Sequence, residues 1–260
     1  MGALEGKRAL VTGGGQGIGR GIALRFGTEG AVVGVADISQ VQADQTVAEI
    51  RVNGAGAEAM PVDVRDRRAA RHMVERFAAA TGGLDILVNS AGVIQIGSFL
   101  DVDDAAWDRV LDVNCKGLLW CSQAAAEVMI AQGHGGKIVN IASQAGRRGE
   151  PFTLPYCASK AAVISMTQSM ALALAPHHIT VNALAPGIIE TPMWEDIDNQ
   201  AVAALGRPAG EAKRIAVAGI PIARIGHPGD VAAAAVFLAS ADADYITQQC
   251  LNVDGGNWPS

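Results

Sequence analysis

The segment RALVTGGGQGIG, residues 8–19, joins a short apolar strand to a glycine-rich turn. Beyond the turn, Ile22, Ala23, Phe26 and Gly27 recur at the spacing of one helix face, so the pattern predicts a strand, a turn and a helix in succession. Such a turn points backbone N–H groups and a helix N-terminus at a pyrophosphate, and side chains at its close-approach positions would block the phosphates. A glycine-rich turn alone can be an ordinary loop, but this context favours a dinucleotide site. The candidate cofactor residues here are Gly13, Gln16, Gly17, Ile18 and Gly19.

A second apolar strand is predicted over residues 31–36, and it ends at Asp37. This carboxylate lies eighteen residues past Gly19, close to the spacing of about 20 expected for the residue that binds the adenosine ribose hydroxyls. A carboxylate there accepts from the ribose 2′-OH and repels a 2′-phosphate, and Ile38 and Ser39 add no positive charge beside it. We therefore expect NAD rather than NADP. The alternative is an aspartate that only caps the next helix.

The segment YCASK, residues 156–160, follows Ser143 by thirteen residues. On a helix, Tyr156 and Lys160 share one face, so the ammonium can lie beside the phenol. A free tyrosine has a pKa near ~10, and lowering it by ~3 units requires roughly 4 kcal/mol of preferential stabilisation of the phenolate. A lysine and a cationic cofactor ring could provide this, which would make Tyr156 a general base for an alcohol proton. The alternative is a solvated tyrosine beside a surface lysine.

With these motifs in order, the chain resembles the short-chain dehydrogenase/reductase family over essentially all of its 260 residues. The segment NSAG, residues 89–92, departs at Ser90 from the Asn-Asn-Ala-Gly usual in that family, a small polar change that we expect to be tolerated. Asp63 and Val64 match the pair that flanks the adenine, and residues 186–191 match the segment that holds the nicotinamide carboxamide. The resemblance adds these cofactor residues: Asp63, Val64, Asn89, Ala91, Gly92, Tyr156, Lys160, Pro186, Gly187, Ile189 and Thr191.

The resemblance also implies a catalytic set of Asn114, Ser143, Tyr156 and Lys160. In this interpretation Tyr156 accepts the hydroxyl proton and Ser143 hydrogen-bonds the developing carbonyl oxygen. Lys160 lowers the tyrosine pKa and binds the nicotinamide ribose, while Asn114 holds a water that relays the proton to solvent.

Strands alternate with helical segments along the chain, and the strands are apolar throughout, which favours a parallel sheet covered by helices on both faces. We expect an α/β single-domain Rossmann fold over residues 1–260, and the resemblance implies a doubly wound sheet of seven parallel strands, the last near residues 250–253. The mostly polar stretch at about 190–219 interrupts the alternation. We interpret it as a lid over the substrate; the alternative is a surface excursion without a role.

Polar residues at the expected substrate cleft favour a polyhydroxylated substrate, because polar groups reject ligands that leave them unpaired. The substrate candidates are Ser143, Gln144, Glu150, Tyr156 and Trp194. Residues 143–150 and 252–258 resemble bacterial sorbitol dehydrogenases of the family, so we expect oxidation of D-sorbitol to fructose. Galactitol or another hexitol, and a 3-oxoacyl-type keto-reduction, remain open as alternatives. From a different class, so does a non-catalytic nucleotide-sensing protein.

The composition of the chain is consistent with an enzyme that acts on small molecules. Half of the residues are hydrophobic and the formal net charge is −6, which disfavours a nucleic-acid or membrane-surface partner. No apolar run reaches ~18 residues, and the four cysteines and five histidines lack metal-ligand spacing. We expect a cytoplasmic protein without a metal. The family resemblance implies a homotetramer, and the long apolar helices expected over residues 107–129 and 155–174 are consistent with helices paired between its subunits.

Overall fold

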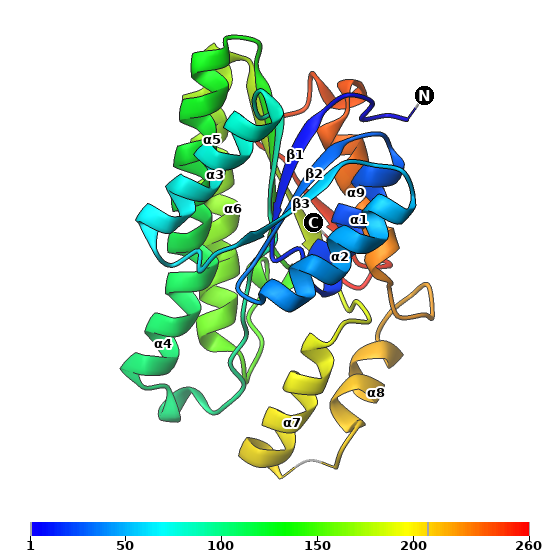
Figure 1. The fold of residues 1–260 in the computed structure, drawn as a ribbon. Helices are drawn as coiled ribbons and strands as arrows, with labels where there is room; N and C mark the ends of the chain where they lie inside the picture. The colour runs from blue at the N-terminus through cyan, green and yellow to red at the C-terminus, as the bar shows by residue number, and fades with distance from the viewer. Residues whose placement is uncertain (1, 207, 260) are drawn as a thin grey trace.

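The apolar strands predicted from the sequence lie side by side in one parallel sheet with the order β3-β2-β1-β4-β5-β6-β7. The computed structural model describes residues 2–206 and 208–259. The predicted single Rossmann-like α/β domain with seven parallel strands is confirmed (Figure 1). The strands are β1 Arg8–Thr12, β2 Val32–Asp37, β3 Ala57–Pro61, β4 Ile86–Asn89, β5 Gly136–Ile141, β6 Ile179–Pro186 and β7 Cys250–Val253.

Helices cover both faces of the sheet (Figure 1). On one face lie α1 Gly17–Thr28, α2 Gln40–Val52 and α9 Pro228–Ala239, and on the other lie α3 Arg67–Thr81, α5 Leu118–Gln132 and α6 Leu154–Leu174. Successive residues of a strand point to opposite faces. In β1, Ala9 and Val11 therefore pack with Phe26, while Leu10 packs with Phe77 in a second core. This double burial explains why the strands lack polar alternation.

The long helix that leads into β5 contains an irregular turn. It begins as α4 Asp104–Leu111, passes through the π-helical segment Asp112–Gly117, and continues as α5. Single π-turns inside helices are common at functional sites. Asn114, a predicted catalytic residue, lies within this turn and is buried. Four short 3-10 segments complete the described structure: Phe99–Asp101, Gln144–Gly146, Ala175–His177 and Ala241–Ala243.

The stretch that interrupts the strand–helix alternation is itself helical. It forms α7 Met193–Leu205 and α8 Glu211–Ala218, which extend beyond the rest of the domain at the bottom of Figure 1. Both helices follow β6, so they lie at the edge of the sheet where the parallel strands end. Their role as a lid stays a prediction. In the part of the chain that the structure describes, no helix has both the length and the apolar character to cross a bilayer.

The strand order reverses beside β1, whose two neighbours are β2 and β4. Ligands of open α/β sheets bind outside the carboxyl ends of the strands at such a point. Thr12 connects the two strand ends here, because its Oγ1 accepts from the backbone N–H groups of Ser90 and Ala91 at 3.1 and 3.3 Å. The glycine turn after β1 and the segment after β4 are thereby held next to each other.

An ion pair fixes the opposite, amino ends of β1 and β4. Arg8 donates from Nε and Nη2 to the Asp85 carboxylate at 2.6 and 2.8 Å, and its backbone N–H donates to the same carboxylate. The Arg8 and Asp85 side chains are 20% and 12% exposed, compared with 43% and 55% for the bidentate surface pair of Arg71 and Glu127. Because solvent screens a surface pair, the Arg8–Asp85 pair should contribute more to stability.

We expect Asp85→Asn to lower the free energy of unfolding by about 1.5–3 kcal/mol, since it weakens several hydrogen bonds to a charged group. The control Glu127→Gln should cost less than about 1 kcal/mol. Urea unfolding at a fixed protein concentration measures both. Equal losses would show that the Arg8–Asp85 pair does not hold these strand ends.

Candidate active site

A cleft of about 1090 Å³ opens at the carboxyl ends of the strands and gathers nearly all the residues predicted from the sequence. Its lining includes the cofactor candidates Gly13, Gln16, Gly17, Ile18, Gly19, Asp37, Asp63, Val64, Ala91, Gly92, Pro186, Gly187, Ile189 and Thr191. It also includes the chemical and substrate candidates Ser143, Gln144, Glu150, Tyr156, Lys160 and Trp194. Asn89 and Asn114 lie outside this lining.

The glycine turn leaves room that side chains would fill, and its shape fits a dinucleotide pyrophosphate. A Cβ at Gly19 would overlap the carbonyl oxygen of Gly13, and a Cβ at Gly13 would lie 2.8 Å from the Ala91 nitrogen. Gly13 also has φ +65°, which L side chains rarely adopt. Gln16 precedes α1 in an extended conformation, and its side chain leaves the first-turn N–H groups uncapped. Uncapped N–H groups at a helix N-terminus bind anions.

Asp37 lines the end of the cleft that is predicted to hold the adenosine. Its Oδ2 accepts from the backbone N–H of Gly15 and its Oδ1 from that of Ser39, both at 2.9 Å. The side chain is buried, and each oxygen keeps acceptor capacity for a ribose hydroxyl. The N-cap of α2 is Ser39, whose hydroxyl accepts from Gln42. Asp37 therefore does not serve as the cap of that helix, which removes the alternative raised by the sequence.

Two other predicted cofactor residues are already hydrogen-bonded to neighbouring side chains of the protein. Asp63 forms a bidentate ion pair with Arg65, and this hydrogen bonding lowers the pKa of the carboxyl. The Asn89 amide donates to Ser122 Oγ and Asn140 Oδ1 at 2.9 and 2.8 Å, buried beneath the cleft. Asn89 thus supports the sheet from behind the cleft wall, and its direct contact with a cofactor stays a prediction.

The structure brings Ser143, Tyr156 and Lys160 together. Ser143 follows β5, its Oγ accepts from the backbone of Ala145 at 3.1 Å, and its hydroxyl is near enough to the Tyr156 phenol to lower the pKa of that group. Lys160 lies one turn along α6 from Tyr156. Its Nζ donates to the carbonyl oxygen of Ile141 at 2.8 Å and lies 5.6 Å from the centre of the Tyr156 ring. The ammonium is therefore anchored at the end of β5, over the ring of the tyrosine.

Burial sets the proton affinities of this pair. It raises the pKa of Tyr156 to about 12, against the opposing effect of the Ser143 hydrogen bond, and the nearby Glu150 charge raises it further. Burial also lowers the pKa of Lys160 to about 8. The predicted lowering of the tyrosine pKa is thus absent in the protein alone. It would need a positive charge brought by the cofactor.

Asn114 acts on the site from the π-turn. Its Oδ1 accepts from the Val93 N–H at 2.9 Å, and its Nδ2 donates to the Val93 carbonyl and to Ser159 Oγ. Ser159 in turn donates to the Tyr156 carbonyl at 2.7 Å. The side chain of Asn114 therefore connects the loop after β4 to the first turn of α6. Its part in a proton relay stays a prediction.

Three residues that were not among the predicted site residues lie at the end of the cleft near Gln144 and Glu150. Arg148, Asn257 and Trp258 line it. The Arg148 guanidinium stacks on the Trp258 ring at 4.7 Å, and Asn257 Nδ2 donates to Gln144 Oε1 at 3.0 Å. Gln144, predicted to bind substrate, is thus already held by the C-terminal segment. More than 100 residues separate these partners, so no local pattern indicates the contact.

Comparisons with known proteins agree with this geometry. A family model described as short chain dehydrogenase matches residues 7–201. Galactitol 2-dehydrogenase of Agrobacterium fabrum is 46% identical over 257 residues, and sorbitol dehydrogenase of Cereibacter sphaeroides is 45% identical over 257; each match covers 99% of both chains. A solved structure described as a candidate 2-deoxy-D-gluconate 3-dehydrogenase from Agrobacterium tumefaciens, with bound NADP, has a TM-score of 0.86 and 39% identity, covering 97% of this chain and 96% of that one.

The raised pKa of Tyr156 can be measured directly, because the chain has two tyrosines and Tyr245→Phe leaves Tyr156 alone. In the free protein, with a pKa of about 12, about 1% of the phenol should be ionised at pH ~10, where an ordinary tyrosine is half ionised. Saturating NAD should increase the ionised fraction several-fold, since a nearby positive charge favours the phenolate.

The phenolate absorbance measures this titration with and without NAD, and the same variant unfolded in urea provides the ordinary curve. Half ionisation of the free folded protein near pH ~10 would show that burial does not control this group.

Proposed function

Since the chain belongs to the short-chain dehydrogenase/reductase family, we propose that it uses NAD to oxidise a secondary hydroxyl of a polyol, with D-sorbitol to fructose as the leading reaction. One observation carries the proposal. Ser143, Tyr156 and Lys160 converge in a cleft that continues from the uncapped glycine turn. Beyond these three residues its lining includes the polar side chains of Gln144, Arg148 and Glu150 among apolar ones.

Residues of the cleft fit the pyrophosphate, the adenosine ribose and the carboxamide of a dinucleotide. The turn of residues 13–19 and the N-terminus of α1 would hold the pyrophosphate, and Asp37 would accept from the adenosine ribose. Thr191 lies close to Gly17 across the cleft and would hold the carboxamide end. When bound, NAD supplies the hydride acceptor and a positively charged ring.

The proton chemistry belongs to Tyr156. As a phenolate it would take the proton of the substrate hydroxyl, and Ser143, whose hydroxyl is near the phenol, would donate to the oxygen as it becomes a carbonyl. Lys160 is fixed by the Ile141 carbonyl, so its positive charge stays near the ring while the phenol ionises. Because the protein alone holds the phenol protonated, we propose that the base forms only in the cofactor complex.

Asp37 supports NAD over NADP. Its carboxylate is buried and held by two backbone N–H groups, so it cannot turn away from a 2′-phosphate. The next residue, Ile38, is 71% exposed and brings no positive charge to pair with such a phosphate. One solved relative contains bound NADP, so the likeness of fold does not decide the cofactor, and our proposal of NAD for this chain rests on Asp37.

The substrate end favours a polyol over an acyl chain. Gln144, Arg148 and Glu150 line it, and an acyl group would leave their polar atoms unpaired. Galactitol is the second candidate, because its 2-dehydrogenase is a full-length relative at 46% identity. The intact Ser143, Tyr156 and Lys160 argue against a protein that only senses nucleotides.

Two further proposals concern closure and assembly. Gln200 on α7 accepts from the Ile96 N–H at 2.9 Å, so α7 contacts the loop after β4, which supports a lid over residues 190–219. Leu154 and Leu172 on α6 and Ile130 on α5 are exposed, which supports pairing of these helices in a homotetramer. The cytoplasmic location stays a prediction.

The absorbance of NADH, followed with NAD and with NADP over D-sorbitol, galactitol, D-mannitol and 2-butanol, tests the proposal. We expect a hexitol to give the highest kcat/KM, with NAD. A clear preference for 2-butanol would remove the polyol assignment, and no turnover of any alcohol, alongside reduction of an acetoacetyl thioester, would favour a keto-reductase.

The cofactor preference can be reversed at Asp37. The double substitution Asp37→Ala with Ile38→Arg should weaken NAD binding and admit NADP, because the repulsion is lost and a phosphate partner is introduced. We expect the NAD to NADP ratio of kcat/KM to fall at least about 100-fold, or about 2.8 kcal/mol at 1.4 kcal/mol per decade.

The single variant Ile38→Arg is the matched control. It keeps the Asp37 carboxylate, so it should retain most of the preference for NAD. Wild-type protein that uses both cofactors equally well would show that Asp37 does not decide the choice.

A further inference from the structure

The substrate end of the cleft contains an ion pair on the loop between Ser143 and Tyr156. Arg148 Nη2 and Glu150 Oε1 lie 3.3 Å apart, and both side chains line the cleft. They are 26% and 31% exposed, so the pair is accessible to a ligand but partly shielded from solvent. An ion pair so near the reacting groups could either bind substrate or set the charge of the pocket.

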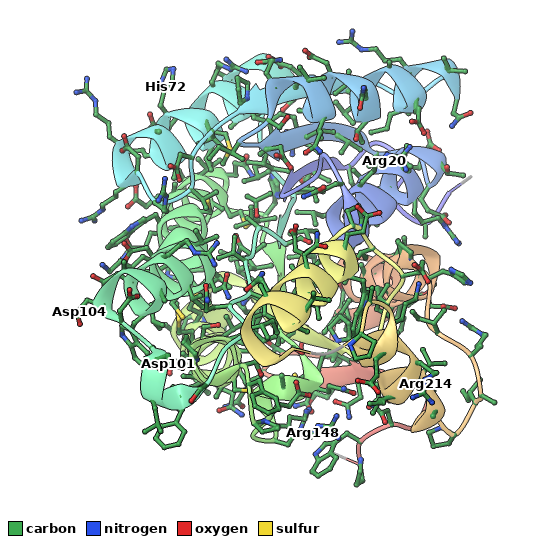
Figure 2. All side chains as sticks on the ribbon, turned by 90° about the horizontal axis from the view of Figure 1, so that it is seen from below. Arg20, His72, Asp101, Asp104, Arg148 and Arg214 are labelled. Carbon is green, nitrogen blue, oxygen red and sulfur yellow. The ribbon has the colours of Figure 1, made fainter. Side chains whose placement is uncertain are left out.

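The C-terminal segment, residues 252–258, also contacts the guanidinium of Arg148. The guanidinium stacks on Trp258, whose backbone N–H donates to Asp254 Oδ2 at 3.0 Å and whose carbonyl accepts from Asn252 Nδ2 at 2.8 Å. The C-terminal segment is therefore ordered where it meets Arg148. Figure 2 looks onto this end of the molecule and shows Arg148 beside the C-terminal segment at the lower edge, with Asp101 and Asp104 to the left.

Arg148 keeps donor capacity that the ion pair does not use. Its Nε–H is buried and finds no acceptor among the described residues, and its contact with Glu150 involves one long hydrogen bond rather than a bidentate pair. A free carboxylate would suit this guanidinium better than Glu150 does, because planar bidentate pairing is the strong geometry of arginine. Glu150 prevents such an anion from binding, since like charges would then share the site.

We propose that Glu150 neutralises Arg148 and so makes the cleft select uncharged polyols over polyol carboxylates such as hexonates, an inference that rests on the proposed function. The hydroxyls of a hexitol can donate to Glu150 and accept from Arg148, so both charges are used. A hexonate offers Arg148 the same oxygens and a charge as well, but it meets repulsion from Glu150. The pair thus acts as a charge filter.

The test is calorimetric titration of the protein–NADH complex with D-sorbitol and with D-gluconate, which have the same chain length and differ in charge. Wild-type protein should bind D-sorbitol more tightly. Glu150→Gln keeps the size and the hydrogen bonding of the side chain and removes its charge, so D-gluconate should bind at least about tenfold more tightly, or about 1.4 kcal/mol, while D-sorbitol does not gain.

Two variants identify the partner of the anion. Arg148→Gln leaves Glu150 unopposed and should weaken D-gluconate binding at least about tenfold more than D-sorbitol binding. The double variant Glu150→Gln with Arg148→Gln should lose the gain in D-gluconate affinity. Glu127→Gln, which breaks the surface ion pair with Arg71, is the matched control and should leave both affinities unchanged.

An unchanged ratio of the two affinities in Glu150→Gln would overturn the inference. A gain that persists in the double variant would also overturn it, because the carboxylate would then lie elsewhere, for example at Arg109, which also lines the cleft. If the wild-type protein binds no hexitol in its NADH complex and oxidises none with NAD, the proposed function itself fails. Oxidation of D-sorbitol without the charge effect rejects the filter alone.

Discussion

The close approach of Gly19 to the carbonyl of Gly13 is the constraint on which the site depends. No side chain fits between them, and Gly13 is pressed in the same way against Ala91 in the segment after β4. The turn can therefore pack closely against the segment after β4 at the point where the strand order reverses. The N-terminus of α1 stays uncapped there. Everything that follows, from the position of Asp37 to that of the tyrosine on α6, is arranged along the cleft that this turn begins.

The same cleft buries two titratable groups, Tyr156 and Lys160, and burial disfavours the charged form of each. Burial raises the pKa of Tyr156 to about 12 and lowers that of Lys160 to about 8, so the free protein disfavours both charged forms. Glu150 adds a negative charge that opposes the phenolate further. A positively charged ring bound beside them would reverse this balance. In this account the base is created by cofactor binding, which protects the site from ionising without a hydride acceptor.

The fold, and the main candidate residues that the structure brings to one cleft, could be predicted because their signals are local. The strand–turn–helix pattern at residues 8–28, Asp37 at a strand end and the Tyr156–Lys160 spacing each depend on neighbours in the sequence. The contact of Arg148 with Trp258 could not be predicted, since it depends on β7 bringing the C-terminal segment back to the cleft. The burial of Asn89 and Asn114 behind the cleft wall likewise follows from side-chain networks that spacing does not show. Residues 190–219 read as mostly polar, yet the structure forms two helices there.

The central claim is that one oxygen, the Tyr156 hydroxyl, moves the substrate proton. Tyr156→Phe keeps the buried ring against Lys160 and removes only that oxygen, so the variant separates chemistry from binding. Turnover of D-sorbitol with NAD, measured together with NADH affinity, gives the answer. If Tyr156 is the base, kcat of the variant falls by at least about 100-fold, within the range for loss of a general base. NADH binding is largely retained. Near-wild-type turnover by Tyr156→Phe would contradict the claim.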